Sequence, residues 1–372
     1  MLYPCLSLGD LETLVKESTN YPSVHWDVGT AYDFFVSLIV LHRPTEFGVR
    51  SSWASGMRQR LPVEDREALE AYLDTVVIYP PLQWLHSLPD PKDSTTMLKT
   101  VREIPPLERM YVLIGLTEAE PVLKDLVERI VERRVWDDAD LDELKAYYKQ
   151  IGKSKPRADL TKKLDSWAQA GEFSDRVLRA LGTYYEAFFA DDERRILPAL
   201  KDGLAQAQEF AQHHDLPELF EEISQGIRYS PERFKGVDQL ILAPSFWASP
   251  FIFYSSPAPL IILFGARPEN ASLVPGELVP DALTASLSAL SDPTRLRILR
   301  YLSSESLTPT QLATRLRLRA PTVLHHIKAL RTAGLIYVIP GPQKKEVHYQ
   351  TRTERLNGIC EMLKEFVCGN DD

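Results

Sequence analysis

Apolar residues recur at three- and four-residue spacing over most of residues 1–235. This period is typical of helices that bury one face, so the pattern predicts a mostly helical region and, for the whole chain, a mainly α fold. We expect helices within residues 10–18, 29–42, 64–78, 120–134, 139–150 and 173–189. Pro156 and Pro198 are expected to lie between helices. Residues 31–42 are shorter than the roughly 18 apolar residues of a membrane span, so they predict a buried core helix.

The period changes after residue 237. Residues 238–245, 249–256 and 259–266 are short runs rich in Ile, Leu and Phe, with prolines between or beside them. Such runs predict strands, and we interpret residues 239–265 as a small antiparallel β meander. The prolines and other turn-formers that follow predict a linker. We therefore expect a helical domain over 1–270 that includes the meander, a linker at 271–280 and a second domain at 281–372.

A new helical pattern begins at residue 281. Leu283, Leu287 and Leu290 form one apolar stripe, and Leu296, Leu299 and Leu302 form the next. Asp292 followed by Pro293 predicts the start of the second helix. The sequence TPTQ at 308–311 predicts a capping box, in which Thr308 and Gln311 satisfy each other's backbone amides.

A further helix is expected from about Pro321 to Gly334. Val323, Ile327 and Leu330 would face the core, and Gly334 would end the helix in a left-handed conformation. Residues 335–340 and 345–350 then read as two strands joined by a turn. Two helices, a tight turn and a hairpin form the pattern of a winged helix-turn-helix, whose second helix can enter the major groove of DNA.

The distribution of charge also separates the C-terminal region from the rest of the chain. The whole chain carries a formal net charge of -9, yet residues 291–352 hold 11 Lys and Arg against 3 Asp and Glu. A basic segment on an acidic protein is expected of a nucleic-acid binder whose other domain has a different role. An evenly solvated surface would account for the charge alone equally well.

The segments LSDPTRLRILRYL, TQLATRL and APTVLHHIKALRTAGLI, with the hairpin after them, resemble the ArsR-type winged-helix repressors in order and spacing. The resemblance covers about the last 90 residues and implies a homodimer whose helix near Pro321 reads an operator. Arg319, Ala320 and Leu324 depart from the family pattern, which leaves the operator open. Residues 32–48 and 51–61 resemble an uncharacterised helical domain that often accompanies such modules.

The resemblance implies a set of DNA-contacting residues. Thr322 and His325 are candidate groove contacts, Lys328 and Arg331 candidate phosphate contacts, and packing or phosphate bonding is the favoured role for His326. Lysines at the wing tip are expected at phosphates or the minor groove, although lysine also protects exposed strand edges. The full candidate set is Thr310, Gln311, Arg319, Pro321, Thr322, His325, His326, Lys328, Arg331, Lys344 and Lys345.

A dimer surface is expected from two helices of the same region. The apolar stripe of the C-terminal helix and that of the helix at 281–290 are the segments available for it. The residues assigned to this surface are Leu283, Leu287, Leu356, Ile359, Leu363 and Phe366.

No metal or cofactor is expected. Many ArsR-type proteins sense metals through a cysteine pair, and TQLATRL contains none. Adjacent residues such as His325 and His326 point about 100° apart on a helix, so they do not make a helical metal pair. The HHD sequence at 213–215 is read as a polar loop, and the many aromatic residues of the first domain as core. The three cysteines, Cys5, Cys360 and Cys368, form no C-x-x-C pair, which fits a reducing compartment.

These observations predict a cytoplasmic, nucleoid-associated, dimeric regulator of transcription that binds double-stranded DNA. We expect a repressor released by an unknown small-molecule or protein effector that acts through the N-terminal domain, with no membrane association and no enzymatic activity. Two alternatives stay open. The winged helix could belong to a protein-interaction adaptor, or it could target an enzyme formed by the N-terminal domain.

Overall fold

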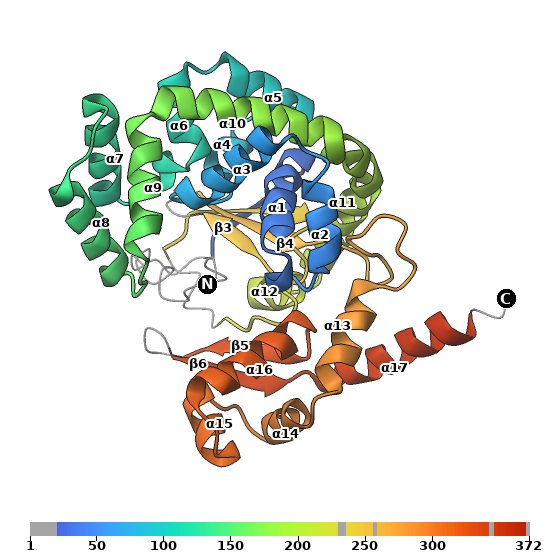
Figure 1. Cartoon of the computed structure of the whole chain (residues 1–372). Coiled ribbons are helices and arrows are strands. Elements are labelled where there is room, and N and C mark those ends of the chain that lie inside the picture. Colours follow the sequence, from blue (N-terminus) through green and yellow to red (C-terminus); the bar gives the residue numbers. More distant parts are fainter. Residues whose placement is uncertain (1–20, 230–235, 256–258, 342–345, 370–372) are drawn as a thin grey trace.

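The computed structural model describes residues 21–229, 236–255, 259–341 and 346–369, and its architecture is mainly α, as the sequence predicts. We call residues 21–270 the body and residues 281–369 the module; they occupy the upper and lower parts of Figure 1. The expected helix at 10–18 lies outside the described residues. The body's helices are α1 (Thr30–His42), α2 (Ser51–Arg58), α3 (Val63–Thr75), α4 (Leu82–His86), α5 (Ser94–Glu103), α6 (Pro106–Leu113), α7 (Pro121–Arg133), α8 (Asp138–Gln150), α9 (Arg157–Ala168), α10 (Ala170–Tyr184), α11 (Ala190–Ala211) and α12 (Leu216–Ile223).

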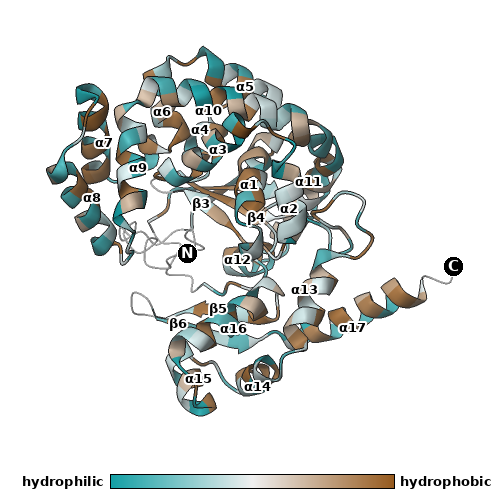
Figure 2. Cartoon of the chain, viewed as in Figure 1, coloured by the Kyte–Doolittle hydropathy of each residue, from teal (hydrophilic) through white to brown (hydrophobic). Residues whose placement is uncertain are grey.

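Two body helices show where pattern and structure agree and differ. Helix α1 is buried on every side from Thr30 to Leu41, which confirms the expected core helix; Figure 2 shows it as largely apolar. Pro156 precedes α9 as expected. Pro198, however, lies inside α11 rather than between helices. The prolyl nitrogen cannot donate to the preceding turn, but the helix continues through it because its apolar residues Ile196 and Leu200 are fully buried.

The body's sheet has four strands in the order β1-β2-β4-β3. Its central pair and its first strand run parallel, and only β3 runs antiparallel to its neighbour β4. The strands are β1 (Ser23–Trp26), β2 (Gln239–Ser245), β3 (Phe253–Ser255) and β4 (Leu260–Gly265).

The antiparallel meander expected over 239–265 is therefore wrong in its pairing, although all three strands exist. Strands β2 and β4 pair parallel from Leu240 beside Leu260 to Ser245 beside Gly265. Their side chains are buried on both faces of the sheet. Strands of parallel sheets are usually buried in this way, so their sequences are continuous apolar runs without alternation. The turn at 246–252 carries the chain across so that β3 forms the edge instead of the middle of the sheet.

The two faces of this sheet bury different cores. Ile241, Ala243 and Leu263 contribute to the large core beneath α1, α3, α10 and α11. Leu240, Leu242 and Ile262 contribute to a smaller core that also contains α12 and, from the module, Val338. The sheet thus links the helical bulk of the body to the module (Figure 1).

The module has its own core, to which each of its helices contributes buried residues. Helix α13 contributes Ala289 and keeps its other face exposed. The predicted helix-turn-helix and hairpin are confirmed. Figure 1 shows α17 projecting away from the rest of the chain. The elements are α13 (Asp281–Leu290), α14 (Pro293–Leu302), α15 (Pro309–Leu316), α16 (Ala320–Thr332), β5 (Ile336–Pro340), β6 (Val347–Thr351) and α17 (Thr353–Cys368).

The body forms a short backbone bridge to one edge of the wing, which we define as β5, β6 and residues 341–346 between them. The Val338 amide donates to the Gly226 carbonyl at 2.9 Å, and the Arg228 amide donates to the Val338 carbonyl at 3.0 Å. On the other side, Leu307 pairs with Tyr349 of β6. Both edges of the wing's base are therefore hydrogen-bonded, and one of the partners belongs to the body.

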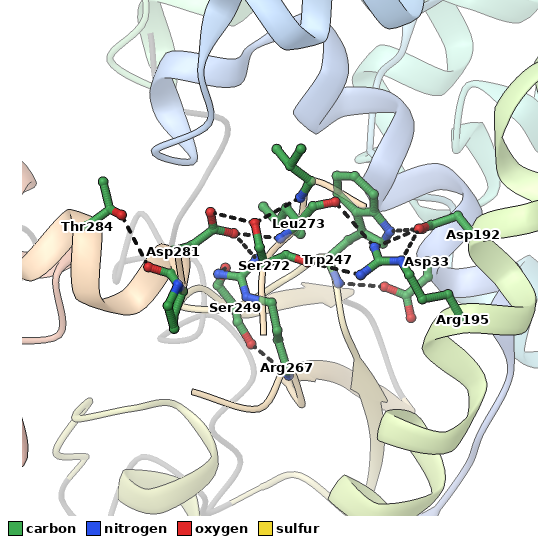
Figure 3. A network of polar contacts seen from close by, with 12 residues as sticks. Asp33, Asp192, Arg195, Trp247, Ser249, Arg267, Ser272, Leu273, Asp281 and Thr284 are labelled. Atoms are coloured by element: carbon green, nitrogen blue, oxygen red, sulfur yellow. Dashed lines mark hydrogen bonds and ion pairs between the residues drawn. The ribbon is translucent and has the colours of Figure 1, made fainter. Parts of the chain in front are cut away.

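A polar network also joins the body to α13 (Figure 3). The Arg195 guanidinium forms an ion pair with Asp192 and donates to the carbonyls of Ser272 and Leu273. The Asp281 carboxylate accepts from the Ser272 hydroxyl at 3.0 Å and from the Leu273 amide at 2.6 Å. The start of the segment between the body and the module is thus held by a charged group of the body and by one of α13.

Candidate nucleic-acid interface

Helix α15 begins as its sequence predicts. The Thr308 hydroxyl accepts from the Gln311 amide at 3.3 Å, and the Gln311 side chain accepts from the Thr308 amide at 2.8 Å, which confirms the capping box. Arg317 ends the helix with a left-handed φ of 56°. Thr310 and Gln311 are exposed, although the Gln311 side-chain oxygen is already engaged by the cap.

Helix α16 buries one face and exposes the other at its start. Val323, Ile327 and Leu330 are buried as predicted, and Gly334 follows the helix with φ +68°. Pro321, Thr322 and His325, all expected at DNA, are exposed in the full chain. Leu324 is 47% exposed beside them, which places an apolar side chain on the same part of the helix.

The N-terminus of α16 lacks a side-chain cap. Arg319 occupies the N-cap position in an extended conformation, is exposed, and makes no capping hydrogen bond. A Ser or Asp at this position would accept from the first amides of the helix. The Thr322 and Val323 amides instead donate to the Arg319 carbonyl at 3.0 and 3.2 Å, and Pro321 has no amide hydrogen, so the exposed guanidinium of Arg319 is the positive group at this end of the helix.

The later candidates on α16 are less accessible. His326 is 14% exposed, and its ring nitrogen lies 3.9 Å from the Asp292 carboxylate. Lys328 and Arg331 are half-buried. Arg331 lies close enough to Tyr349 for its charge to oppose the rise that burial causes in the pKa of that phenol. The wing-tip residues Lys344 and Lys345 lie outside the described residues.

Helix α14 carries the arginines that make its sequence basic. Its expected N-cap is confirmed, because the Asp292 carboxylate accepts from the Arg295 amide at 2.9 Å. The buried stripe differs by one position: Ile298 is buried and Leu296 is 48% exposed, since Ile298 lies one turn before the fully buried Leu302. Arg295 donates to the carbonyl of Ser288 at 2.8 Å, whereas Arg297 and Arg300 are exposed.

The residues assigned to a dimer surface divide into two groups. Leu283 and Ile359 are 1% and 2% exposed within this single chain, because α13 and α17 pack on the module, and Leu356 is half-buried. Leu283 and Ile359 therefore have almost no surface left for a partner, whereas Leu356 keeps part of its surface. Leu287, Leu363 and Phe366 are 42%, 36% and 44% exposed. Figure 2 shows apolar residues along the projecting part of α17.

The HHD sequence at 213–215 lies where a polar loop was expected. The His214 ring stacks on Phe210, and Asp215 caps α12 in a capping box with Glu218. In the described ranges, no three His, Cys, Asp or Glu side chains are grouped as a metal site would require. The same ranges hold no helix with the length and apolar character needed to span a membrane. Cys360 and Cys368 are free and exposed, and Cys5 lies outside the described residues.

The sequence gives no local signal for a cavity between the body and the module. It has a volume of about 450 Å³ and is lined by the carboxyl end of β4, by α11 and α12, and by residues of α13, α16 and α17. Its lining comes from positions more than 200 residues apart, so only the folded chain brings them together. The buried guanidinium of Arg267 lies in its wall.

The comparisons with known proteins concern only the module. A family model described as a helix-turn-helix domain matches residues 290–339. No curated protein was found to match the chain. Three solved structures each match 23% of this chain. An ArsR-like transcriptional regulator from Rhodococcus sp. RHA1 is 29% identical and is covered over 78% of its own chain, with a TM-score of 0.22. NolR from Sinorhizobium fredii is 25% identical, covered over 85% of its chain, with a TM-score of 0.20, and HlyU from Vibrio cholerae N16961 is 30% identical, covered over 92% of its chain, with a TM-score of 0.19.

The overlap with these structures is confined to the module, so the assignment depends on the family-model match and on the motifs of this segment. The match spans the end of α13, the helix-turn-helix and most of β5. Those are the elements whose caps, buried stripe and hairpin the structure confirms. The C-terminal part of this chain is a winged helix-turn-helix domain, and its sequence is similar to that of an ArsR-like transcriptional regulator.

Proposed function

We propose that this protein is a sequence-specific regulator of transcription that binds double-stranded DNA. The observation that carries the proposal is the exposed start of α16 in the full chain, where Thr322 and His325 are accessible. In a helix-turn-helix, the N-terminal residues of the second helix contact base edges in the major groove. Leu324 adds an apolar group suited to the methyl group of thymine.

Electrostatics supports the same surface. Arg297, Arg300 and Arg319 are exposed. Phosphate oxygens bind exposed guanidinium groups of this kind. The acidic body would repel DNA, so binding is expected to be confined to the module.

We further propose a homodimer located at the nucleoid. The exposed apolar residues of α17, together with Leu287 of α13, are the surface that supports it. A dimer presents two reading helices to two half-sites of an operator.

The finer proposal is a repressor that an effector releases by acting on the body, with no enzymatic activity in the body. The parallel pairing of Gly226–Arg228 with β5 supports it, because a shift of this segment would move the wing. An effector can act in this way only if it binds two arrangements of body and module with different affinity.

Fluorescence anisotropy of the full chain on labelled DNA from its own promoter region, against unrelated DNA, tests the proposal. We expect a specific complex that survives competitor and weakens steeply as the salt concentration rises. Lys344→Ala should lower the slope of log Kd against log salt by about one. Sequence-blind binding at every salt concentration would contradict specific regulation.

The adaptor alternative has one structural observation in its favour. Leu318 and Leu324 are 36% and 47% exposed near the start of α16, and an apolar pair can also serve a protein partner. The two functions separate in the same experiment. An adaptor would bind no DNA even at low salt, whereas a regulator binds all DNA weakly there.

A further inference from the structure

The first turns of α16 present one side that is poor in hydrogen-bonding groups. Successive residues of a helix are about 100° apart, so positions 320, 321, 324, 325 and 328 share about 140° of its circumference. Val323, Ile327 and Leu330 lie on another side, in the module's core. We call the shared side the reading face, and it consists of Ala320, Pro321, Leu324, His325 and Lys328.

Hydrogen bonds from this part of α16 discriminate poorly between bases. Bases are distinguished best by Arg, Lys, Asn or Gln, which make two hydrogen bonds to one base. No such residue occurs in α16 before Lys328, which is half-buried. The hydroxyl of Thr322 and the imidazole of His325 can each donate or accept, so each suits more than one base. A selective contact must therefore come from another kind of group.

Leu324 is the largest apolar group of the reading face, and it is 47% exposed. Pro321 and Ala320 lie three and four positions before it, which places them beside it on the helix surface. Leu318, in the turn that precedes α16, is 36% exposed. A single exposed leucine is common on protein surfaces. Here several apolar groups lie together where α16 begins.

The charges around these apolar groups favour DNA over a protein partner. Arg317 and Arg319 are exposed on either side of Leu318 in the chain. Residues 306–345 contain no Asp or Glu. The major groove has matching chemistry, because phosphates line its edges and the 5-methyl group of thymine is an apolar group on its floor.

We propose that Leu324 contacts the 5-methyl group of a thymine, and that this methyl contact is the main source of base selection by α16. A cytosine with a 5-methyl group presents that group at the same place in the groove. Operator affinity is therefore sensitive to cytosine methylation at this position. The methyl contact rests on the proposed function, which it narrows to duplexes with a 5-methylpyrimidine opposite Leu324.

The size of the effect follows from the area of one methyl group. Removing one such group from water changes an equilibrium constant by about fourfold. A dimer on two half-sites makes the contact twice, so both methyl groups together change the affinity by about fifteenfold. Both ratios lie well within the range that a binding titration measures.

The experiment uses the full chain and DNA in which only methyl groups differ. Selection from a pool of random duplexes gives the sequence that binds most tightly. Fluorescence anisotropy then gives the Kd of this duplex and of copies in which one thymine is replaced by deoxyuridine, which pairs in the same way and lacks the methyl group. A third set places cytosine or 5-methylcytosine, each paired with guanine, at the position that responds.

The variants are Leu324→Ala, which removes the apolar contact, and Leu324→Met, which keeps an apolar side chain of similar length. Leu296→Ala is the matched control, because Leu296 is 48% exposed on α14. Circular dichroism verifies that each variant is folded. Leu324 is exposed in the module, so its replacement leaves the core intact.

We expect one thymine in each half-site whose replacement by deoxyuridine weakens wild-type binding about fourfold. At that position 5-methylcytosine should bind about fourfold more tightly than cytosine. Both ratios should fall to about one in Leu324→Ala and persist in Leu324→Met and Leu296→Ala.

Three outcomes would overturn the inference. Equal affinity for thymine and deoxyuridine at every position would exclude the methyl contact and leave the proposed function in place, because the selected duplex still binds specifically. Unchanged ratios in Leu324→Ala would assign the methyl contact to another residue. A wild-type chain that binds no duplex, even at low salt, would refute the proposed function together with the methyl contact and assign the apolar groups to a protein partner.

Discussion

The guanidinium of Arg228 in the body lies 3.4 Å from the centre of the Tyr337 ring in the wing. The same group donates to the Gln350 side chain at 3.1 Å and forms an ion pair with Glu221 at 2.9 Å. One side chain thus connects α12, β5 and β6. Together with the backbone hydrogen bonds at Val338, it holds the base of the wing against the body.

Replacing this side chain should loosen the body from the module. Arg228→Met removes a cation–π contact and two polar contacts at a partly exposed site, so we expect the free energy of unfolding to fall by about 1–2 kcal/mol. Urea unfolding should also become less cooperative, with the module unfolding first. Arg315→Met is the matched control: Arg315 lies over Tyr301 and pairs with Glu305, all within the module. Equal changes in both variants would argue against a joining role for Arg228.

The contact to DNA is tested most directly at the start of α16. Arg319→Ala should weaken binding to every DNA sequence to a similar extent and lower the salt slope by about one, because it removes one exposed cation at the start of α16. Anisotropy titrations at four salt concentrations measure the slope. Lys364→Ala, at an exposed position on α17, should leave it unchanged. A loss of affinity limited to one DNA sequence would instead assign Arg319 to base reading.

The elements with local signals were predictable, and the contacts between distant segments were not. The capping box of Thr308 and Gln311 and the left-handed Gly334 depend on residues a few positions apart, and both are confirmed. The parallel pairing of β2 depends on β1, a strand of four residues more than 200 positions away. The pairing of Ile227 with Val338 involves too few residues to show any periodicity.

The candidate site shows the same difference between features with a local sequence signal and features that depend on distant segments. Thr322 and His325 were identified from a resemblance and are exposed as a contact requires. Leu283 and Ile359, which were assigned to a dimer surface, are buried within this chain; an apolar stripe alone does not show whether its partner is the same chain or another.

A buried lysine in the body should make stability depend on pH. The Lys163 ammonium donates to the Val76 carbonyl at 2.7 Å and lies near the rings of Tyr148 and Trp167. Burial lowers its pKa from 10.5 to about 7. Between these values the unfolded chain binds more protons than the folded one, so the free energy of unfolding rises with pH.

Lys163→Met should remove this dependence. From pH 7 to pH 9, we expect wild type to gain about 2 kcal/mol relative to the variant, because one fully shifted group contributes at most about 1.4 kcal/mol per pH unit. Urea unfolding at the two pH values gives the difference. Lys162→Met, with the neighbouring exposed side chain, serves as the control. Parallel pH profiles for wild type and Lys163→Met would show that the ammonium stays charged when buried.

The oligomeric state is tested on the projecting helix α17. Phe366 and Val367 are 44% and 70% exposed, and Leu287 of α13 is 42% exposed. Covering one phenylalanine contributes about 1.5–3 kcal/mol, and burying a carboxylate in its place costs more. Phe366→Glu should therefore raise the dissociation constant of the dimer at least a hundredfold, as measured by analytical ultracentrifugation.

Val122→Glu is the control for this change, because Val122 is 56% exposed on α7, far along the chain from the module. It adds the same charge at an apolar position of similar exposure and should leave the dimer intact. The DNA titration then links assembly to function. A monomeric Phe366→Glu protein should bind a single half-site with unchanged salt slope per module and lose most of its affinity for the full operator. A wild-type chain that stays monomeric at tens of micromolar would contradict the dimer, and the apolar face of α17 would then require a different partner.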